Sequence, residues 1–292
     1  MTAKFLIHDL QLPAEVAGAR FDQALAVALP QYSRARLQRW ISAGSVLLDG
    51  RAVRPRERLA GGERVRVQAE FPADTTVEAE AISLQVVYED EALLVIDKPA
   101  GLVVHPGAGN PRHTLQNALL AHDQALATVP RAGLIHRLDK ETSGLLVVAR
   151  TPEIHVQLVR TLQERRIARG YLALCLGRPT AGGTIAEPIG RHRTQRTRMA
   201  VRRDGREAVT HYRIEERFRG HTLLRVQLET GRTHQIRVHL AHAGFPIVGD
   251  PLYGGRRRQV AGAGAVLQRA LAAFRRQALH AQRLALDHPV TG

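Results

Sequence analysis

Sulfur-containing and aromatic side chains are scarce in this chain of 292 residues. There is one cysteine, Cys175, so no disulfide can form within the chain, which fits a reducing, cytoplasmic compartment. Cys175 lies in the apolar run "YLALCLG", where we predict a buried structural thiol rather than a nucleophile. Aromatic residues make up only 4% of the sequence. Each tyrosine and the single tryptophan are therefore more informative than usual.

Long apolar runs are also missing. No segment approaches the roughly 20 apolar residues that a membrane-spanning helix needs. Asp9 and Glu15 interrupt the first residues, where a secretory signal peptide would need an unbroken apolar stretch. The hydrophobic content of 44% and charged content of 24% are those of a globular protein. We expect no association with a membrane.

Acidic residues are too few to balance the basic ones. The chain has 27 Asp and Glu against 42 Lys and Arg, a net charge of +15 with neutral histidines. Most of the basic residues are arginines, whose planar guanidinium suits phosphates and base edges. Such a charge attracts a polyanion and makes its binding depend on salt. A basic proteome or a solubility bias is the alternative, but the arginines cluster in particular segments, which favours nucleic acid.

Residues 18–68 predict a compact unit of two short helices and a small sheet. Apolar residues at helical spacing and a following proline predict the first helix: Phe21, Leu25, Leu29 and Pro30. A serine cap, an apolar face and a terminal glycine predict the second: Ser33, Leu37, Trp40, Ile41 and Gly44. "SVLLDGRAV" predicts a hairpin that turns at Asp49-Gly50, and "RVRVQ" a further strand.

Arginines lie on both parts of this unit. The candidate nucleic-acid contacts are Arg34, Arg36, Arg39, Arg51 and Arg54. Two helices followed by a small sheet, over "RFDQALAVALPQYSRARLQRWISAGSVLLDGRAV", resemble the S4-like RNA-binding module. The resemblance implies phosphate contacts that position RNA with little sequence discrimination; the alternative is a solvated helix face. Residues 69–84 are acidic, contain Pro72 and lack periodicity, so we predict a flexible linker there.

Residues 85–292 predict a larger domain with an α+β fold. Strands are predicted over "VVYEDEALLVIDKP", "GLLVVAR", "YLALCL" and "HTLLRVQLE", and "RTRMAVRRDGREAVTHYRIEE" predicts a hairpin around Asp204-Gly205. Helices are predicted from Thr151-Pro152 and over "RTHQIRVHLAHAG", ending at Gly244. We expect a mixed, largely antiparallel sheet with flanking helices. The glycines of "HPGAGNP" lack the spacing of a phosphate-binding loop.

Three histidines close together in the sequence raise the possibility of a metal site. They are His234, His239 and His242. Helical spacing does not bring all three to one face, and Arg232 and Arg237 among them would repel a cation. No cysteine or carboxylate nearby in sequence completes a ligand set. We therefore expect no metal, and assign these histidines to polar or RNA contacts.

"LIHRLDKETSGLLVV", residues 134–148, places a run of charges between two apolar runs. A lone aspartate in such a loop is usually a cap or turn residue. Here Leu138 can anchor the loop in the core and leave Asp139 raised for chemistry. No second carboxylate has acid–base spacing from it, which argues against a two-carboxylate glycosidase. The residue pattern alone leaves the turn and the reactive carboxylate both open.

"HRLDKETSG" resembles the signature loop of the RNA pseudouridine synthases. Three further blocks follow the pattern of that family in order: "IDKPAGLVVHPG", "ARGYLAL" and "LETGRTHQIRVHLAHAGFPIVGDPLYGG". The S4-like unit and phrases such as "TAGGTIAEPI" and "AVTHYRI" are most similar to bacterial members that act on the large ribosomal subunit. The resemblance implies 23S rRNA, or a subunit precursor, as partner, with uridines of the helix 69 hairpin as substrate. It implies a monomer without cofactor. The family usually continues past "LALDHPVTG" with a further strand and a closing helix, so this chain is either short or truncated.

The resemblance implies parts for three residues in the reaction. Asp139 would be the catalytic carboxylate, ionised so that it attacks C1′ of the ribose or C6 of the uracil. Because a buried carboxylate resists ionisation, it needs a cation beside it, and the resemblance implies Arg232 as that partner. Tyr171 would stack on the flipped uracil and transfer a proton late in the reaction. Taken alone, Arg232 is equally a phosphate contact, and Tyr171 an ordinary core residue.

The resemblance also implies five contacts to the substrate. Arg137 would enter the space that the base vacates, and Leu228 and Ile236 would form apolar walls of the pocket. Arg169 would meet a phosphate at a position where the family often has lysine, and His136 would contact the substrate as well. Two alternatives stay open: a non-catalytic RNA-binding factor of ribosome assembly, and a synthase that acts on other rRNA or tRNA uridines.

Overall fold

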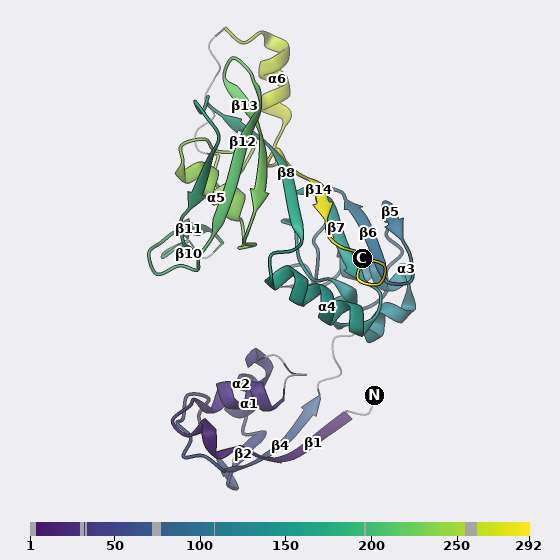
Figure 1. The fold of residues 1–292 in the computed structure, drawn as a ribbon, viewed down its shortest axis with the longest axis vertical. Helices are drawn as coiled ribbons and strands as arrows, with labels where there is room; N and C mark the ends of the chain where they lie inside the picture. Colours follow the sequence, from purple (N-terminus) through teal and green to yellow (C-terminus); the bar gives the residue numbers. More distant parts are fainter. Residues whose placement is uncertain are drawn as a thin grey trace. The chain divides into compact units, whose positions relative to one another are not determined.

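The structure is a computed structural model. It describes residues 4–29, 32, 34–71, 77–107, 109–195, 197–254 and 262–292. The chain divides into two compact units, Met1–Thr76 and Val77–Gly292, which are described separately below (Figure 1). No helix in the described part of the chain has the length and apolar character needed to cross a membrane.

The first unit is a four-stranded antiparallel sheet with two helices. Its elements are β1 (Lys4–Gln11), η1 (Ala14–Val16), α1 (Phe21–Ala28), α2 (Arg34–Ser42), β2 (Val46–Leu48), β3 (Arg51–Ala52) and β4 (Arg64–Phe71). The strand order is β1-β4-β2-β3. Asp49 and Gly50 both have positive φ, 47° and 79°, as a tight turn between β2 and β3 requires. The predicted helices, hairpin and strand are confirmed; Pro30 and Ser33 lie outside the described residues.

The compact unit, Met1–Thr76, extends beyond the predicted residues 18–68 at both ends. The predicted start at residue 18 omitted β1, which pairs along its whole length with β4. The predicted linker, 69–84, begins inside β4 and ends in a segment that belongs to the second unit. There Glu80 N–H donates to Asn117 O at 3.0 Å, and Asn117 Nδ2 donates to the carbonyl of Glu78 at 2.7 Å. Strand pairing and backbone anchoring of this kind are non-local, so composition did not reveal them.

A buried carboxylate holds the two helices of the first unit together. The Asp22 side chain on α1 is fully buried and accepts hydrogen bonds from Arg20, Arg34 and Gln38. Burial alone would raise the pKa of Asp22, but the hydrogen bonds from Arg34, Gln38 and Arg20 lower it to about 2. The folded unit therefore favours the ionised carboxylate.

We expect Asp22→Asn to lower the free energy of unfolding of this unit by about 1.5–3 kcal/mol, because two guanidinium groups lose their anion. The folded-state pKa lies below the unfolded value of 3.8. The advantage of the wild type is therefore complete above that value and disappears as the pH falls toward 2. Urea unfolding followed by the fluorescence of Trp40, the single tryptophan, measures it. Asp9→Asn, at an exposed pair with Arg66, is the control; equal pH profiles for the two variants would refute the role of Asp22.

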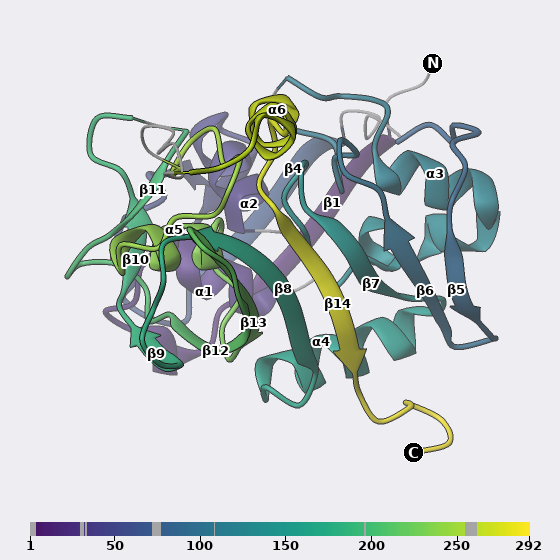
Figure 2. The same cartoon turned by 90° about the horizontal axis from the view of Figure 1, so that it is seen from above.

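The second unit is built on an eight-stranded sheet. Its strands are β5 (Val86–Glu89), β6 (Leu93–Lys98), β7 (Ser143–Ala149), β8 (Ala168–Leu176), β9 (Gly183–Ala186), β12 (Val209–Arg217), β13 (His221–Leu228) and β14 (Leu279–Ala285). The order is β5-β6-β7-β14-β8-β13-β12-β9, which Figure 2 shows from one edge to the other. Only β7 and β14 run parallel; the other neighbouring pairs are antiparallel. The predicted α+β fold with a mixed, largely antiparallel sheet is confirmed.

The hairpin predicted around Asp204-Gly205 was wrong. β11 (Met199–Val201) pairs with β10 (Ile189–Arg191) in a separate two-stranded sheet, and β12 pairs with β9 and β13. The turn at 204–205 instead returns the chain to Ile189, which bridges Arg206. Turn chemistry marked the reversal correctly, but it does not specify which strand the returning chain will meet.

Helices cover both faces of the large sheet. They are α3 (Leu115–His122), α4 (Pro152–Gln163) and α5 (Gln235–His242), with short 3-10 turns η2 (Gln124–Thr128) and η3 (Pro130–Gly133). A further helix, α6 (Ala265–Ala273), has no buried residue. Leu158 of α4 packs with Val147 and Ala149 of β7 on one face. Leu119 of α3 and Ile236 of α5 join the main core on the other.

Near the centre of the sheet, β7 and β14 approach each other closely. Gly144 has φ 116°, and a Cβ there would lie 2.3 Å from the carbonyl oxygen of Ala281, so only glycine fits. The loop of residues 138–142 enters β7 just before this close approach, and Leu138 is buried in the main core, as predicted. The loop residue Asp139 therefore stands on a rigid base near the middle of the sheet.

Candidate active site

A cavity of about 510 Å³ opens on the face of the sheet that carries α5. Its wall is formed by the loop before β7, by β8, by the end of β13 and by the first turn of α5. The volume is in the range of small-molecule sites. All eight residues that the sequence suggested for chemistry or substrate contact line it: His136, Arg137, Asp139, Arg169, Tyr171, Leu228, Arg232 and Ile236.

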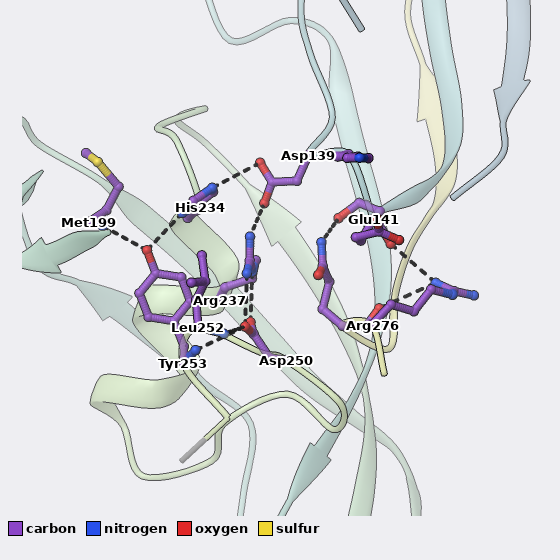
Figure 3. Close-up of polar contacts among 12 residues, drawn as sticks. Asp139, Glu141, Met199, His234, Arg237, Asp250, Leu252, Tyr253 and Arg276 are labelled. Atoms are coloured by element: carbon purple, nitrogen blue, oxygen red, sulfur yellow. Dashed lines mark hydrogen bonds and ion pairs between the residues drawn. The ribbon is translucent and has the colours of Figure 1, made fainter. Parts of the chain in front are cut away.

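The cationic partner of Asp139 is Arg237. Its Nη1 donates to Asp139 Oδ2 at 2.9 Å (Figure 3). Arg232, the predicted partner, instead donates from Nε to the carbonyl of Glu207 at 3.0 Å, and its backbone N–H donates to Gln235 Oε1 at 2.9 Å. The predicted pairing was therefore wrong. The reason is helix phase: Arg232 lies in the turn before α5, whereas Arg237 lies on the buried side of the helix.

A second carboxylate fixes Arg237. Asp250 accepts from its Nε at 2.8 Å and from its Nη2 at 2.9 Å, and also from the backbone N–H groups of Leu252 and Tyr253. Burial alone would lower the pKa of Arg237 and raise that of Asp250, but their mutual hydrogen bonds reverse both directions. The guanidinium thus stays charged, with one nitrogen left to hold Asp139.

Tyr171 and Arg169 stand on the same strand, β8, at the wall of the cavity. Burial raises the pKa of Tyr171 to about 12; Asp139 adds to the shift and Arg169 opposes it. The phenol is therefore protonated at neutral pH. Arg169 is 7% exposed, and its Nε has no hydrogen-bond partner among the described residues. A buried cation that has no carboxylate partner in the described part of the chain is suited to an anionic ligand.

His136 is a neutral imidazole attached to the sheet. Its Nε2 accepts the N–H of Val147 at 3.3 Å, which places the proton of the ring on Nδ1. Burial, with a smaller effect of Arg169, lowers the pKa of His136 to about 3. The residue can offer a hydrogen bond to a ligand but adds no charge to the cavity.

Hydrogen bonds from two buried side chains fasten the loop that carries Asp139. Lys98 Nζ donates to the carbonyls of Pro99, Leu102 and Lys140 at 2.7, 2.9 and 3.1 Å. Burial lowers the pKa of Lys98 to about 8, against the opposing charges of Glu141 and Asp139. Gln277 Nε2 donates to Thr142 Oγ1 at 3.1 Å. Sequence reasoning missed this role of Lys98, although the residue lies in the block "IDKPAG".

The three histidines considered for a metal have separate tasks. His239 meets Thr210 Oγ1 at 2.8 Å and the carbonyl of Glu187 at 2.9 Å, and His234 meets Tyr253 Oη at 2.8 Å. His242 is exposed at the end of α5. Over the residues whose positions are described, no three His, Cys, Asp or Glu side chains gather as metal ligands would.

The five candidate RNA contacts of the first unit differ in what they already bind. Arg34 is held by Asp22, and Arg51 Nη2 lies 2.6 Å from Glu57 Oε1. Arg36 is partly buried, whereas Arg39 and Arg54 are exposed. The structure describes no side-chain hydrogen bond or ion pair from Arg39 or Arg54 to another described residue. These two are the most available of the five for a ligand.

Comparison with known proteins identifies the class. A family model described as RNA pseudouridylate synthase matches residues 92–242, and one described as S4 domain matches residues 19–65. The chain therefore belongs to the RNA pseudouridylate synthase family. It is an RNA pseudouridine synthase, an isomerase, with an S4 domain in its N-terminal part.

Two relatives and one solved structure are similar to this chain over most of its length. The "Ribosomal large subunit pseudouridine synthase D" of Xanthomonas campestris pv. campestris is 57% identical over 286 residues, which cover 98% of this chain and 86% of the relative. The protein of the same name from Pseudomonas aeruginosa is 54% identical over 97% of this chain and 88% of the relative. Among solved structures, the chain resembles Human RNA Pseudouridylate Synthase Domain Containing 1, with a TM-score of 0.55, 28% identity and coverage of 72% and 81%.

Proposed function

We propose that this enzyme converts uridines of large-subunit ribosomal RNA to pseudouridine, with Asp139 as the reacting group and without a cofactor. The observation that carries the proposal is the ion-paired carboxylate of Asp139, which faces a cavity shared with the buried phenol of Tyr171. The relatives named above act, by their names, on the large ribosomal subunit. The net charge of +15 supports an RNA partner.

The reaction needs little beyond a positioned carboxylate. The N1–C1′ bond of uridine breaks, the uracil turns, and C5 bonds to C1′; N1 gains a proton and C5 loses one. Atoms and electrons balance without oxidant, reductant or water. Because Arg237 holds Oδ2 of Asp139, Oδ1 is the oxygen left to attack C1′ or C6.

The rest of the cavity suits a nucleotide turned out of its stack. Leu228 and Ile236 offer apolar walls, and Tyr171 offers a protonated ring that can stack on the uracil, a contact worth about 1–3 kcal/mol. Arg169 faces the phosphate of the flipped nucleotide, because its Nε has no hydrogen-bond partner among the described residues. Arg137 is exposed at the wall, where it can occupy the gap that the base leaves in the RNA.

Within the large subunit RNA, we propose the helix 69 hairpin of 23S rRNA as the substrate. The S4 domain supplies phosphate contacts through residues such as Arg39 and Arg54, which add affinity but little discrimination. Selection of the uridine then falls to the cavity and to the accessibility of the hairpin. A synthase acting on other rRNA or tRNA uridines is the alternative that the experiment must separate.

The purified protein should modify unmodified 23S rRNA but neither 16S rRNA nor tRNA transcripts. Pseudouridines are mapped by carbodiimide treatment and primer extension, with product expected at helix 69. Large-subunit particles lacking the modification, tested in parallel, show whether the free RNA or the assembled subunit reacts faster. Product in tRNA alone, or modification elsewhere in 23S rRNA, would contradict the proposed substrate.

A further inference from the structure

His234 is held in an unusual backbone conformation beside Asp139. It precedes α5 as the N-cap residue with φ 57° and ψ 21°, in the left-handed region that non-glycine residues seldom adopt. This conformation turns the imidazole toward the cavity, where Nε2 lies 3.9 Å from Asp139 Oδ1. Oδ1 is the carboxylate oxygen that Arg237 leaves free. Such strain at a reactive group points to a task for the side chain.

Tyr253 determines which nitrogen of His234 carries the proton. Its hydroxyl accepts the N–H of Met199 at 2.8 Å and meets His234 Nδ1 at 2.8 Å. A hydroxyl has one proton, and among the described residues His234 Nδ1 is the one acceptor that it meets. Donation to Nδ1 satisfies both groups and leaves the proton of the neutral imidazole on Nε2. We assign this tautomer from the hydrogen bonds.

The protonation of His234 follows from its surroundings. Burial lowers the pKa of the imidazole, and the cations Arg237 and Arg137 act in the same direction, while Asp139 and Asp250 oppose them. The ring is therefore neutral at physiological pH. It presents an N–H to Asp139 without adding a second full positive charge.

The segment of residues 250–253 contacts both Arg237 and His234, the two side chains beside Asp139. Asp250 holds Arg237 through two hydrogen bonds, and the backbone N–H of Tyr253 donates to Asp250. The centroid of the Tyr253 ring lies 5.1 Å from the guanidinium carbon of Arg237. The same ring packs edge-on against the His234 ring, with 5.6 Å between the two ring centroids. Figure 3 shows the two arms converging on Asp139, with Arg237 at one oxygen and His234 at the other.

We propose that His234 is a positioning residue for this reaction: its Nε2–H, aimed by Tyr253, holds the attacking oxygen of Asp139. A distance of 3.9 Å is too long for a hydrogen bond. Catalytic hydrogen bonds are often long in ligand-free structures and tighten when the substrate enters, and a closure of about 1 Å completes this one. The inference rests on the proposed role of Asp139.

Side-chain length provides the test. His234→Gln keeps an N–H donor near the position of Nε2, whereas His234→Asn tolerates the left-handed backbone but is too short to reach Asp139. We expect the Asn variant to lower the single-turnover rate constant about 100-fold, as misplacement of a reacting group by about 1 Å can. The Gln variant should recover most of this loss. The dissociation constant for the RNA should stay within about threefold, because the residue acts on Asp139.

Tyr253→Phe tests the arm behind His234. We expect a smaller loss, about 10-fold, because the imidazole remains but its tautomer is no longer fixed. Adding Tyr253→Phe to His234→Asn should cost little more, since both act through one contact. Tyr88→Phe, which removes an exposed hydroxyl, should react at the wild-type rate.

Three results would overturn the inference. They are a wild-type rate for His234→Asn, a Gln variant as slow as the Asn variant, or a loss of RNA affinity that accounts for the loss of rate. Asp139→Asn, assayed beside them, separates this inference from the proposed function. An inactive Asp139→Asn with fully active His234 variants defeats the positioning role alone, whereas an active Asp139→Asn defeats the role of Asp139 itself.

Discussion

Asp139→Asn is expected to abolish pseudouridine formation while the RNA still binds. Asparagine has nearly the same shape and can still accept a hydrogen bond from Arg237, but its amide oxygen cannot attack carbon as a carboxylate does. Loss of a reacting group of this kind lowers a single-turnover rate by roughly 10⁴-fold or more. Release of tritium from RNA labelled at uracil C5 measures the rate, because C5 loses its hydrogen only when it bonds to C1′.

Binding has to be measured on the same variant. We expect the dissociation constant of the RNA to change by less than about threefold, since most of the affinity comes from phosphate contacts away from Asp139. Asp287→Asn, which loses an exposed ion pair to Arg166, is the matched control and should release tritium normally. Tritium release by Asp139→Asn near the wild-type rate would show that another group reacts with the uridine.

Local patterns were sufficient to predict most elements of the fold. The turn at Asp49-Gly50 and the cap at Thr151 both act within a few residues, and the structure confirms the hairpin and the helix that they predicted. Which strands pair with one another depends on residues that are distant in the sequence. β14 lies between β7 and β8 in the sheet, although it is the last strand in the sequence. No feature of residues 279–285 predicts these two neighbours. The wrong hairpin around Asp204-Gly205 has the same cause.

The residues that line the site could be predicted from the sequence, but the hydrogen bonds and ion pairs among them could not. The pattern around Asp139 correctly suggested a raised loop anchored by Leu138. Arg237 was overlooked as the partner of Asp139 because a sequence does not distinguish a buried arginine from a solvent-exposed one. Its two carboxylate partners lie 98 and 13 residues away in the chain, so their proximity depends on the fold. His234 was assigned, with two other histidines, to polar or RNA contacts and not to Asp139. Its contact with Tyr253 depends on the fold of the segment after α5.

Arg237→Met is expected to affect stability and catalysis together, because one guanidinium holds two carboxylates. Asp250 is fully buried, and leaving it without its cation should cost about 3–5 kcal/mol of the free energy of unfolding. Asp139 would lose the group that favours its ionised form in the cavity, and we expect a rate loss of about 10³-fold. Arg237→Lys keeps the charge but cannot bridge both carboxylates, so it should fall between the wild type and Met.

A double variant separates the two effects. Arg237→Met with Asp250→Leu replaces the buried pair by apolar side chains, which is often neutral or stabilising. We expect urea unfolding, followed by circular dichroism, to return toward wild-type stability while tritium release stays low. Arg213→Met, an exposed arginine of β12, controls for the loss of a positive charge. If the stable double variant regained the wild-type rate, Arg237 would be a structural residue and Asp139 would need no cation. If it stays inactive, the guanidinium of Arg237 is required at the reacting carboxylate itself.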